Sequence, residues 1–366
     1  MTHRRLTLRH PSGETAILAG HGALEAAREE LIGWLAGRTV FLLTTPRVRE
    51  LHGERLGPLA EAAARWVPME VPEGEEAKSV ATANRLWNEM LREGGKRDSR
   101  LLAFGGGSVG DLGGFVAGCF LRGIELVQIP TTLLAQVDAA IGGKTGVDLA
   151  DGKNTVGLFN HPYRVVEETA FLATLPREEL RSGLVEVVKM ALLLDPGLLE
   201  RVEAELPRLL TGDPETLAPV VAGAAAAKIG VVERDPVENG ERKLLNFGHS
   251  LGHALEAELA YRGLRHGEAV AYGILFALRL AADRGLDPTV AGRMRELLHR
   301  FELPPLPSLD AATLIGYMRR DKKARESGLA WVLPAALGRG EIVEGLAFDV
   351  VEARLRGFLE DPWAPA

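Results

Sequence analysis

Apolar and polar positions follow two different patterns along the chain. In the first half, short apolar runs typical of buried strands alternate with stretches of helical periodicity; the strand-like runs are 40–43, 66–71, 101–104 and 125–129, and the helical stretches include 47–64 and 76–93. From about Thr174 onward the pattern is almost wholly helical, with helix stops expected at Pro196, Pro207, Pro214 and Pro288. The first half therefore predicts a parallel, doubly wound α/β domain, and the second half predicts a helical domain.

A glycine-rich turn in the predicted α/β domain is the first candidate for ligand binding. The apolar run 101–104 leads into Gly105, Gly106 and Gly107, and a helical pattern follows. Without side chains, the backbone amides of such a turn can approach an anion, and the helix adds the positive end of its dipole. We predict a pyrophosphate site here, while the sequence GGGSVG fits a tight strand-to-helix connection without a ligand equally well.

The helical half brings together side chains that bind metals. His249 and His253 are four residues apart in the amphipathic pattern KLLNFGHSLGHALEAELA, and His266 opens the next helical run. Glu186 and Lys189 are three residues apart in an otherwise apolar helix, where an unpaired carboxylate would be costly to bury. Two imidazoles and one carboxylate would form a three-ligand zinc site with an open position. Spacing alone fits a hydrogen-bonded histidine face and an ordinary Glu186–Lys189 ion pair as well.

Composition narrows the class of protein. A chain of 366 residues fits two domains, and 46% hydrophobic residues with a mean hydropathy of +0.02 are typical of a globular protein. The net charge of −7 and the pI near 5.8 disfavour nucleic acid as a partner. We find no signal-like segment at the N-terminus and no apolar run of 18 residues, so we expect no membrane association. The single cysteine, Cys119, suits a reducing cytoplasm, and its apolar neighbours predict that it is buried.

Seven motifs occur together in a fixed order. They are GGGSVGDLGGFVAGCFLRG, PTTLLAQVDAAIGGKTGVD, GKNTVGLFNHP, GLVEVVK, LLNFGHSLGHALE, RHGEAVAYG and DKK. In this order and spacing, over roughly residues 70–325, the chain resembles the 3-dehydroquinate synthases. We therefore expect a Rossmann-like α/β NAD-binding domain over residues 1–170 and an all-α metal- and substrate-binding domain over 171–366, with the active site in the cleft between them.

The resemblance also implies a reaction. Members of this family convert 3-deoxy-D-arabino-heptulosonate 7-phosphate to 3-dehydroquinate and phosphate, a step of the shikimate pathway of aromatic amino acid biosynthesis. The reaction proceeds by NAD-dependent oxidation, phosphate elimination, re-reduction and intramolecular aldol closure, so that NAD+ is regenerated. The resemblance thus implies a lyase with bound NAD+, one divalent metal (Zn²⁺ or Co²⁺) and a homodimeric, cytoplasmic form.

Roles follow position by position from the same resemblance. Glu186, His249 and His266 match the family's metal ligands, and His253 then matches an acid/base or phosphate-side group. The positions that match the substrate-carboxylate site are Lys228 and Arg242, and those that match the phosphate site are Arg122, Lys144, Asn154, Asn246 and one of Lys322 and Lys323. Further substrate-contacting matches are Asp138, Lys153 and Lys189. The NAD-binding matches are Glu75, Lys78, Gly106, Gly107, Ser108, Asp111, Thr131 and Thr132, together with Asp138, Lys144 and Lys153.

Some positions have simpler explanations or depart from the family. Thr44 stands where relatives often carry an aspartate for the adenosine ribose, and a hydroxyl cannot accept two hydrogen bonds from a ribose diol as a carboxylate does. Thr131 fits a helix N-cap without any cofactor, and Lys322 and Lys323 lie in a charge run typical of a solvated face.

Three other functions fit parts of the pattern. Metal-dependent polyol or alcohol dehydrogenases have a similar build but usually carry an Asp-x-x-x-His pair where this chain has Glu186 and Lys189. A sugar phosphate cyclase with a carboxylate-free substrate is disfavoured by Arg242, Lys228 and Asn246. An inactive NAD-binding module would be expected to lack metal ligands, and this chain has all three.

Overall fold

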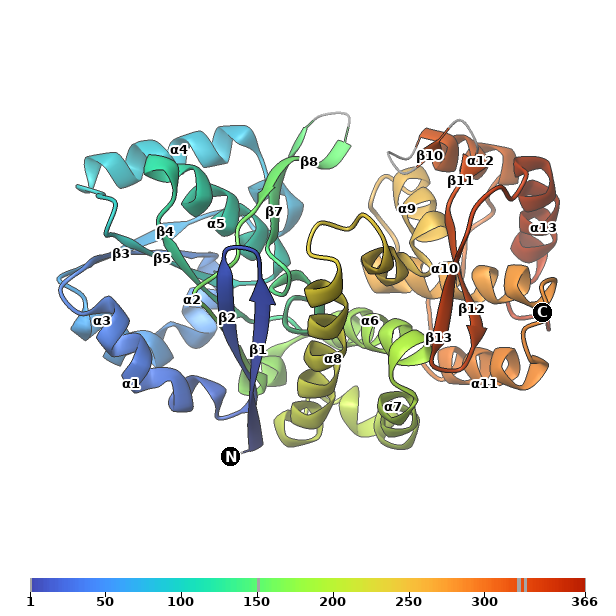
Figure 1. Cartoon of the computed structure of the whole chain (residues 1–366), viewed down its shortest axis with the longest axis horizontal. Helices are drawn as coiled ribbons and strands as arrows, with labels where there is room; N and C mark the ends of the chain where they lie inside the picture. The colour runs from blue at the N-terminus through green and yellow to red at the C-terminus, as the bar shows by residue number, and fades with distance from the viewer. Residues whose placement is uncertain (1, 150–151, 321–323, 326–327, 366) are drawn as a thin grey trace. The chain divides into compact units, whose positions relative to one another are not determined.

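The computed structural model describes residues 2–149, 152–320, 324–325 and 328–365 (Figure 1). The chain forms two compact units: the first comprises Met1–Leu180 and Pro207–Val237, and the second comprises Arg181–Leu206 and Glu238–Ala366. This division differs from a single boundary at 170/171, because residues 207–237 contact the sheet of the first unit.

The first unit is built on a seven-stranded sheet in the order β1-β2-β9-β6-β5-β3-β4. Its strands are β1 Thr2–His10, β2 Gly13–His21, β3 Thr39–Thr44, β4 Arg65–Glu70, β5 Arg100–Gly105, β6 Glu125–Pro130 and β9 Arg164–Glu168. All neighbouring pairs are parallel except β1 and β2, which form an antiparallel hairpin at one edge. The four runs predicted as strands are β3, β4, β5 and β6, so the parallel α/β sheet is confirmed.

Helices cover both faces of this sheet. They are α1 Ala23–Leu35, α2 Pro46–His52, α3 Gly57–Ala62, α4 Val80–Arg92, α5 Gly107–Cys119 and α8 Pro214–Arg234. Successive residues of β3 point to opposite faces: Phe41 and Leu43 join a core with α4 and α5, whereas Val40 and Leu42 join a core with α1. Burial on both faces explains why the central strands are continuous apolar runs.

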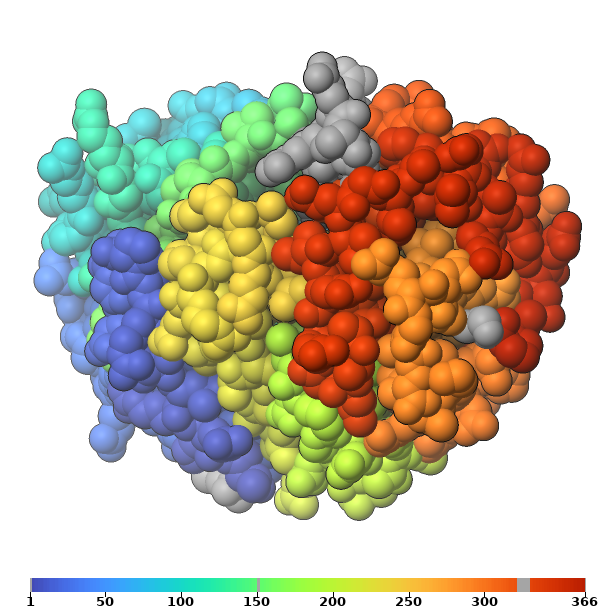
Figure 2. Space-filling view, turned by 45° about the vertical axis from the view of Figure 1, so that its right-hand side comes forward, coloured from blue at the N-terminus to red at the C-terminus, as the bar shows by residue number. Residues whose placement is uncertain are grey.

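The long helix α8 covers the edge of the sheet that carries the N-terminal hairpin. Leu8, Ile17 and Val165 form a third core with Ala225 and Ile229 of α8, and in Figures 1 and 2 the blue hairpin lies beside the yellow segment that contains the end of this helix. Within the described residues, α8 is the one helix long and apolar enough to cross a membrane, but 67% of its most apolar stretch is buried, as in a core helix. A separate antiparallel hairpin is formed by β7 Lys144–Leu149 and β8 Gly152–Phe159.

The second unit is helical, as expected. Its helices are α6 Arg177–Leu194, which begins in the first unit, α7 Pro196–Leu209, α9 His249–Glu258, α10 His266–Ala282, α11 Pro288–His299, α12 Ala311–Arg320 and α13 Phe348–Glu360. Unlike the expected all-α domain, it also contains short strands: β10 Ala324–Arg325, β11 Gly328–Leu329, β12 Trp331–Ala336 and β13 Arg339–Val343.

Three of the four expected helix stops are found, and two other sequence expectations are wrong. The preceding helices end before Pro196, Pro214 and Pro288, and these prolines begin α7, α8 and α11, because the first helical position needs no amide hydrogen. Pro207 lies inside α7; it cannot donate to the carbonyl of Glu203 four residues earlier, and that carbonyl instead accepts a hydrogen bond from Arg300 at 2.8 Å. Cys119 is exposed rather than buried, since it is the last residue of α5 and its neighbours along the sequence are not its neighbours in space.

Candidate functional site

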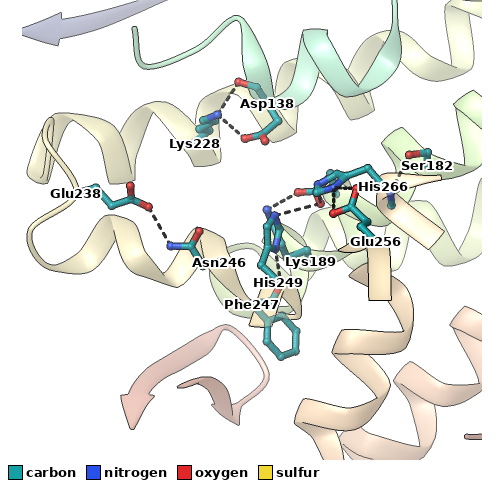
Figure 3. Close-up of polar contacts among 12 residues, drawn as sticks. Asp138, Ser182, Lys189, Lys228, Glu238, Asn246, Phe247, His249, Glu256 and His266 are labelled. Carbon is teal, nitrogen blue, oxygen red and sulfur yellow. Dashed lines mark hydrogen bonds and ion pairs between the residues drawn. The ribbon is translucent and has the colours of Figure 1, made fainter. Parts of the chain in front are cut away.

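Three potential metal ligands meet in the second unit, two of which are the histidines labelled in Figure 3. Glu186 lies in the middle of α6, His249 is the first residue of α9, and His266 is the first residue of α10. Their ligand atoms all lie within 4.8 Å of one another. Glu186 Oε1 is 3.9 Å from His249 Nε2 and 3.6 Å from His266 Nε2.

Glycines allow the histidine-bearing helices to approach closely. Gly248 has a φ of +78°, in the left-handed region, and ends the preceding turn just before α9 begins. A Cβ on Gly273 of α10 would lie 1.8 Å from the carbonyl oxygen of Gly248, so no larger residue fits at this contact. The contact holds the start of α9 against α10.

The second nitrogen of each ligand histidine has an acceptor beside it. His249 Nδ1 lies 3.1 Å from the carbonyl oxygen of Phe247, and His266 Nδ1 lies 3.3 Å from both carboxyl oxygens of Glu256. A carbonyl oxygen only accepts, so Nδ1 of His249 carries the proton and Nε2 keeps its lone pair. Metal-binding histidines are oriented in the same way in many proteins.

Glu186 provides a test of whether a metal fits. Its side chain is fully buried, and neither carboxyl oxygen has a hydrogen-bond partner among the residues the structure describes. The ammonium group of Lys189 forms an ion pair with Oε2, while Oε1 faces the two histidines. Glu186 therefore takes part both in the ion pair with Lys189 and in the cluster of possible metal ligands. A divalent cation would satisfy the remaining carboxylate charge, so the donor set fits one.

The electrostatics of the cluster favour positive charge. Burial opposes protonation of His266, but the hydrogen bond and charge of Glu256, followed by the charge of Glu186, outweigh it and raise the pKa of this imidazole. His253 lies one turn beyond His249 with its ring centre 5.2 Å from that of His249, and it is outside the ligand set.

Two further residues of the second unit that we predicted to bind substrate, Arg242 and Asn246, lie just before α9. Arg242, in a short 3-10 helix (η6, Glu241–Asn246), is only 1% exposed. Asn246 donates a hydrogen bond to Glu238 Oε1 at 2.9 Å (Figure 3). Lys322 and Lys323 lie outside the described residues.

In the first unit, the glycine turn has the expected form. Strand β5 ends at Gly105, Gly106 is the N-cap of α5, and no side chain caps this helix. Gly106 has an ordinary φ of −75°, so the need for glycine comes from space: a Cβ would lie 3.2 Å from Thr132 Cγ2. Thr132 rather than Thr131 acts as the local cap, since its hydroxyl accepts from the amide of Ala135 at 3.2 Å.

Lys78 contacts several residues of the first unit that we predicted to bind NAD+ or substrate. It is almost fully buried and donates hydrogen bonds to Asp111 Oδ2 at 2.9 Å and Asn154 Oδ1 at 2.6 Å, with Glu75 Oε2 at 3.5 Å. Burial opposes its charge, but Asp111 and Glu75 outweigh burial and raise the pKa of Lys78. Burial also raises the pKa of Asp111 despite Lys78. Residues far apart in the sequence therefore form one charged cluster.

Asp138 and Lys228 form a second pair in this unit. The ammonium group of Lys228, on α8, donates to the backbone carbonyl of Asp138 at 2.5 Å and also contacts its carboxylate (Figure 3). Lys144 and Lys153 lie on the β7–β8 hairpin.

Arg122 and Thr44, the last two positions considered from the sequence, lie apart from these clusters. Arg122 is exposed beyond the C-terminal end of the 13-residue helix α5, about 20 Å along the helix from the glycine turn. Within the described residues we find no hydrogen bond or ion pair that joins it to the other candidates. Thr44 ends β3 and is fully buried.

Sequence reasoning missed Glu256. Glu256 stands seven residues after His249, two helical turns along the same face, so the spacing could have predicted that it lies near the histidines. Ser182, which contacts the backbone beside His266, gave no such signal because its partner lies 85 residues away.

Two family models match consecutive parts of the chain. Residues 68–182 match the model described as 3-dehydroquinate synthase N-terminal, and residues 183–324 match 3-dehydroquinate synthase C-terminal. The chain belongs to the 3-dehydroquinate synthase family. Among curated relatives, the 3-dehydroquinate synthase of Geobacter metallireducens is 44% identical over 348 residues, covering 93% of each chain. That of Symbiobacterium thermophilum is 44% identical over 86% of this chain and 89% of its own.

Solved structures of other enzymes share the fold of this chain. The 2-epi-5-epi-valiolone synthase of Streptomyces hygroscopicus, solved with NAD+ and Zn²⁺ bound, is 29% identical with a TM-score of 0.82 and covers 89% of this chain and 92% of its own. An iron-containing alcohol dehydrogenase of Thermotoga maritima is 16% identical with a TM-score of 0.67, over 94% of this chain and 98% of its own. At that identity the likeness concerns the fold alone.

Proposed function

We propose that this protein is a 3-dehydroquinate synthase, which converts 3-deoxy-D-arabino-heptulosonate 7-phosphate to 3-dehydroquinate and phosphate. The observation that carries the proposal is the buried cluster of Glu186, His249 and His266. It occurs in a chain whose curated relatives of that name are 44% identical over most of their length.

We assign Glu186, His249 and His266 to one divalent metal, Zn²⁺ or Co²⁺, which when bound would polarise the substrate hydroxyls. The fully buried Glu186 carboxylate supports this assignment. Hydrogen bonds at Nδ1 of the two histidines hold their Nε2 atoms toward Glu186. Lys189 neutralises part of the carboxylate charge at Oε2, while Oε1 faces the histidines.

We assign NAD+ to the N-terminus of α5, where it would accept and return a hydride. Gly106, Gly107 and Ser108 offer backbone amides at the positive end of the helix. The further NAD-binding residues in this proposal are Glu75, Lys78, Asp111, Thr131 and Thr132. The Streptomyces relative solved with NAD+ supports the assignment.

The substrate carries a carboxylate and a phosphate, and the chain supplies basic groups for each. We assign Lys228 and Arg242 to the carboxylate; Asp138 fixes the ammonium of Lys228, and the Arg242 fork suits bidentate binding. For the phosphate we propose Lys144, Asn154, Asn246 and one of Lys322 and Lys323; Arg122, beyond the far end of α5, is left out of this set. We assign proton transfer during phosphate release to His253, and its ring, 5.2 Å from that of His249, supports this assignment. Lys153 completes the substrate-contacting set.

A sugar phosphate cyclase with another substrate is the second candidate, because 2-epi-5-epi-valiolone synthase is 29% identical over 89% of this chain. Phosphate release distinguishes the two. Purified protein with NAD+ and Zn²⁺ is given the heptulosonate phosphate, sedoheptulose 7-phosphate or glycerol in separate reactions. We expect stoichiometric phosphate from the first alone. Phosphate from sedoheptulose 7-phosphate, or NADH accumulation with glycerol, would replace the proposal with a different cyclase or a dehydrogenase.

A further inference from the structure

Helix α6 and the start of α10 meet in a tight polar contact next to the metal ligands. The hydroxyl of Ser182 accepts a hydrogen bond from the backbone amide of Gly267 at 2.9 Å (Figure 3), and both residues are buried. A Cβ on Gly267 would lie 2.1 Å from the carbonyl oxygen of Ser182. The two backbones are therefore in direct contact at this point.

A buried ion pair lies beside this contact. Arg181 donates from Nε to Glu268 Oε1 at 2.8 Å, and a second guanidinium nitrogen contacts the same oxygen. The other oxygen, Glu268 Oε2, accepts from the backbone amide of Arg265 at 2.8 Å. Glu268 is 2% exposed and the Arg181 side chain is 15% exposed, so the carboxylate end of the pair is shielded from water. We call these contacts, made by Arg181, Ser182, Gly267 and Glu268, the α6–α10 junction.

The α6–α10 junction holds the residues on both sides of His266 and lies one helical turn from Glu186. His266 is flanked by Arg265 and Gly267, whose amides are both held by the junction. Glu186 follows Ser182 by four residues, on the same face of α6. The separation of 3.6 Å between Glu186 Oε1 and His266 Nε2 thus depends on how closely the junction holds the two helices.

We propose that Ser182 is a positioning residue for the metal site, acting with Arg181 and Glu268. Its hydroxyl is not one of the proposed ligand atoms. Its hydrogen bond fixes the start of α10 against α6, so that Glu186 and His266 converge before a metal arrives. This inference rests on the proposed metal site and adds the device that preorganises it.

The test measures Zn²⁺ affinity without substrate or NAD+. Wild-type and variant proteins are stripped with a chelator and titrated with Zn²⁺ in competition with a chromophoric chelator. We expect Ser182→Ala to bind Zn²⁺ about 10- to 100-fold more weakly, the range found when residues that orient metal ligands are lost. Ser182→Thr, which keeps the hydroxyl, should recover part of the affinity. The absorption spectrum of the Co²⁺-loaded protein should shift in Ser182→Ala, because the ligand geometry changes.

Ser99→Ala is the matched control. Ser99 is 2% exposed, and its hydroxyl also accepts from a backbone amide, that of Lys96, at 2.9 Å. It lies in the first unit, so its loss should lower stability without changing Zn²⁺ affinity. If Ser182→Ala does not fold, Arg181→Met removes the other half of the junction and should weaken Zn²⁺ binding in the same direction.

The outcomes separate this inference from the proposed function. Failure of wild-type protein to bind Zn²⁺, or binding by His266→Ala equal to wild type, would overturn the metal site itself. Tight binding by the wild type together with equal affinities for Ser182→Ala, Arg181→Met and Ser99→Ala would overturn the positioning role alone.

Discussion

Two consecutive glutamates end strand β9, and their environments are opposite. Glu168 accepts hydrogen bonds at 3.0 to 3.1 Å from three backbone amides, those of Gly22, Leu24 and Ala170. Glu167 points to the other face of the sheet and is fully buried, and neither carboxyl oxygen has a hydrogen-bond partner among the described residues. We predict that Glu167→Leu stabilises the first unit.

The expected gain follows from what the substitution removes. Burying a polar group without a hydrogen bond costs about 1 to 3 kcal/mol on the scale of protein mutations. A leucine of similar volume adds apolar burial, and imperfect fit subtracts up to about 1.5 kcal/mol. A net gain of about 2 kcal/mol or more at pH 7 would raise the unfolding temperature of a unit of this size by roughly 4 to 8 °C.

The gain should also depend on pH. Burial raises the pKa of Glu167 well above its ordinary value of 4.5, and the charge of Lys228 opposes burial only in part. Above about pH 4.5 the folded wild type therefore holds a proton that the unfolded chain has lost. Its free energy of unfolding falls by about 1.4 kcal/mol per pH unit until the folded pKa is reached. Leucine does not titrate, so the advantage of the variant should grow as the pH rises through this window.

Calorimetric unfolding at pH steps from 5 to 8 measures both effects. Glu167→Gln keeps a buried polar group but cannot ionise, so it should remove only the pH-dependent part. Glu168→Gln should instead lose about 1.5 to 3 kcal/mol, because its hydrogen bonds involve a charged acceptor. A less stable Glu167→Leu at every pH, with a Glu167→Gln difference that does not change with pH, would refute the reasoning and mean that Lys228 stabilises an ionised Glu167.

Three further predictions test the proposed site. Alanine in place of Glu186, His249 or His266 should deplete the metal after mild chelation, as measured by elemental analysis; full occupancy in one variant would remove that residue from the ligand set. Gly106→Val should abolish NAD+ binding in calorimetric titration, because the side chain would fill the space beside the turn, and near-normal affinity would place the phosphates elsewhere. Arg242→Leu should lower kcat/KM for the heptulosonate phosphate by about 2 to 5 kcal/mol with metal and NAD+ binding unchanged, and wild-type kcat/KM would exclude its carboxylate role.

The sheet was predictable where both of its faces are buried. Strands β3 and β5 read as continuous apolar runs because helices cover them on both sides. Strand β1 was not predicted, since most of its residues are exposed and its sequence THRRLTLRH is largely polar. It forms because Leu8 packs with Ile17 and with residues of α8 more than 200 positions away. The local sequence pattern cannot predict a packing partner at that distance along the chain.

The spacing of His249, His253 and His266 in the sequence indicated a metal site but did not determine which two of them bind the metal. His249 and His253 share a helix face, so local periodicity favours that pair. The cluster instead joins His249 with His266, because the close contact of Gly248 with Gly273 sets the start of α9 against α10. The set implied by the family resemblance is the one whose ligand atoms lie close together in the structure, whereas periodicity alone favours His253, which lies outside this cluster.

Gly267 shows why the sequence cannot reveal how such a site is held. In RHGEAVAYG, a glycine directly after His266 suggests a flexible helix start, and glycine lowers helix stability relative to alanine. Its place in the structure gives a different reason, since any Cβ there would collide with the carbonyl oxygen of Ser182. A larger residue would have to push α10 away from α6, and the same movement would separate His266 from Glu186. The glycine therefore lowers the intrinsic stability of one helix and permits the contact that brings Glu186 and His266, two of the proposed metal ligands, together.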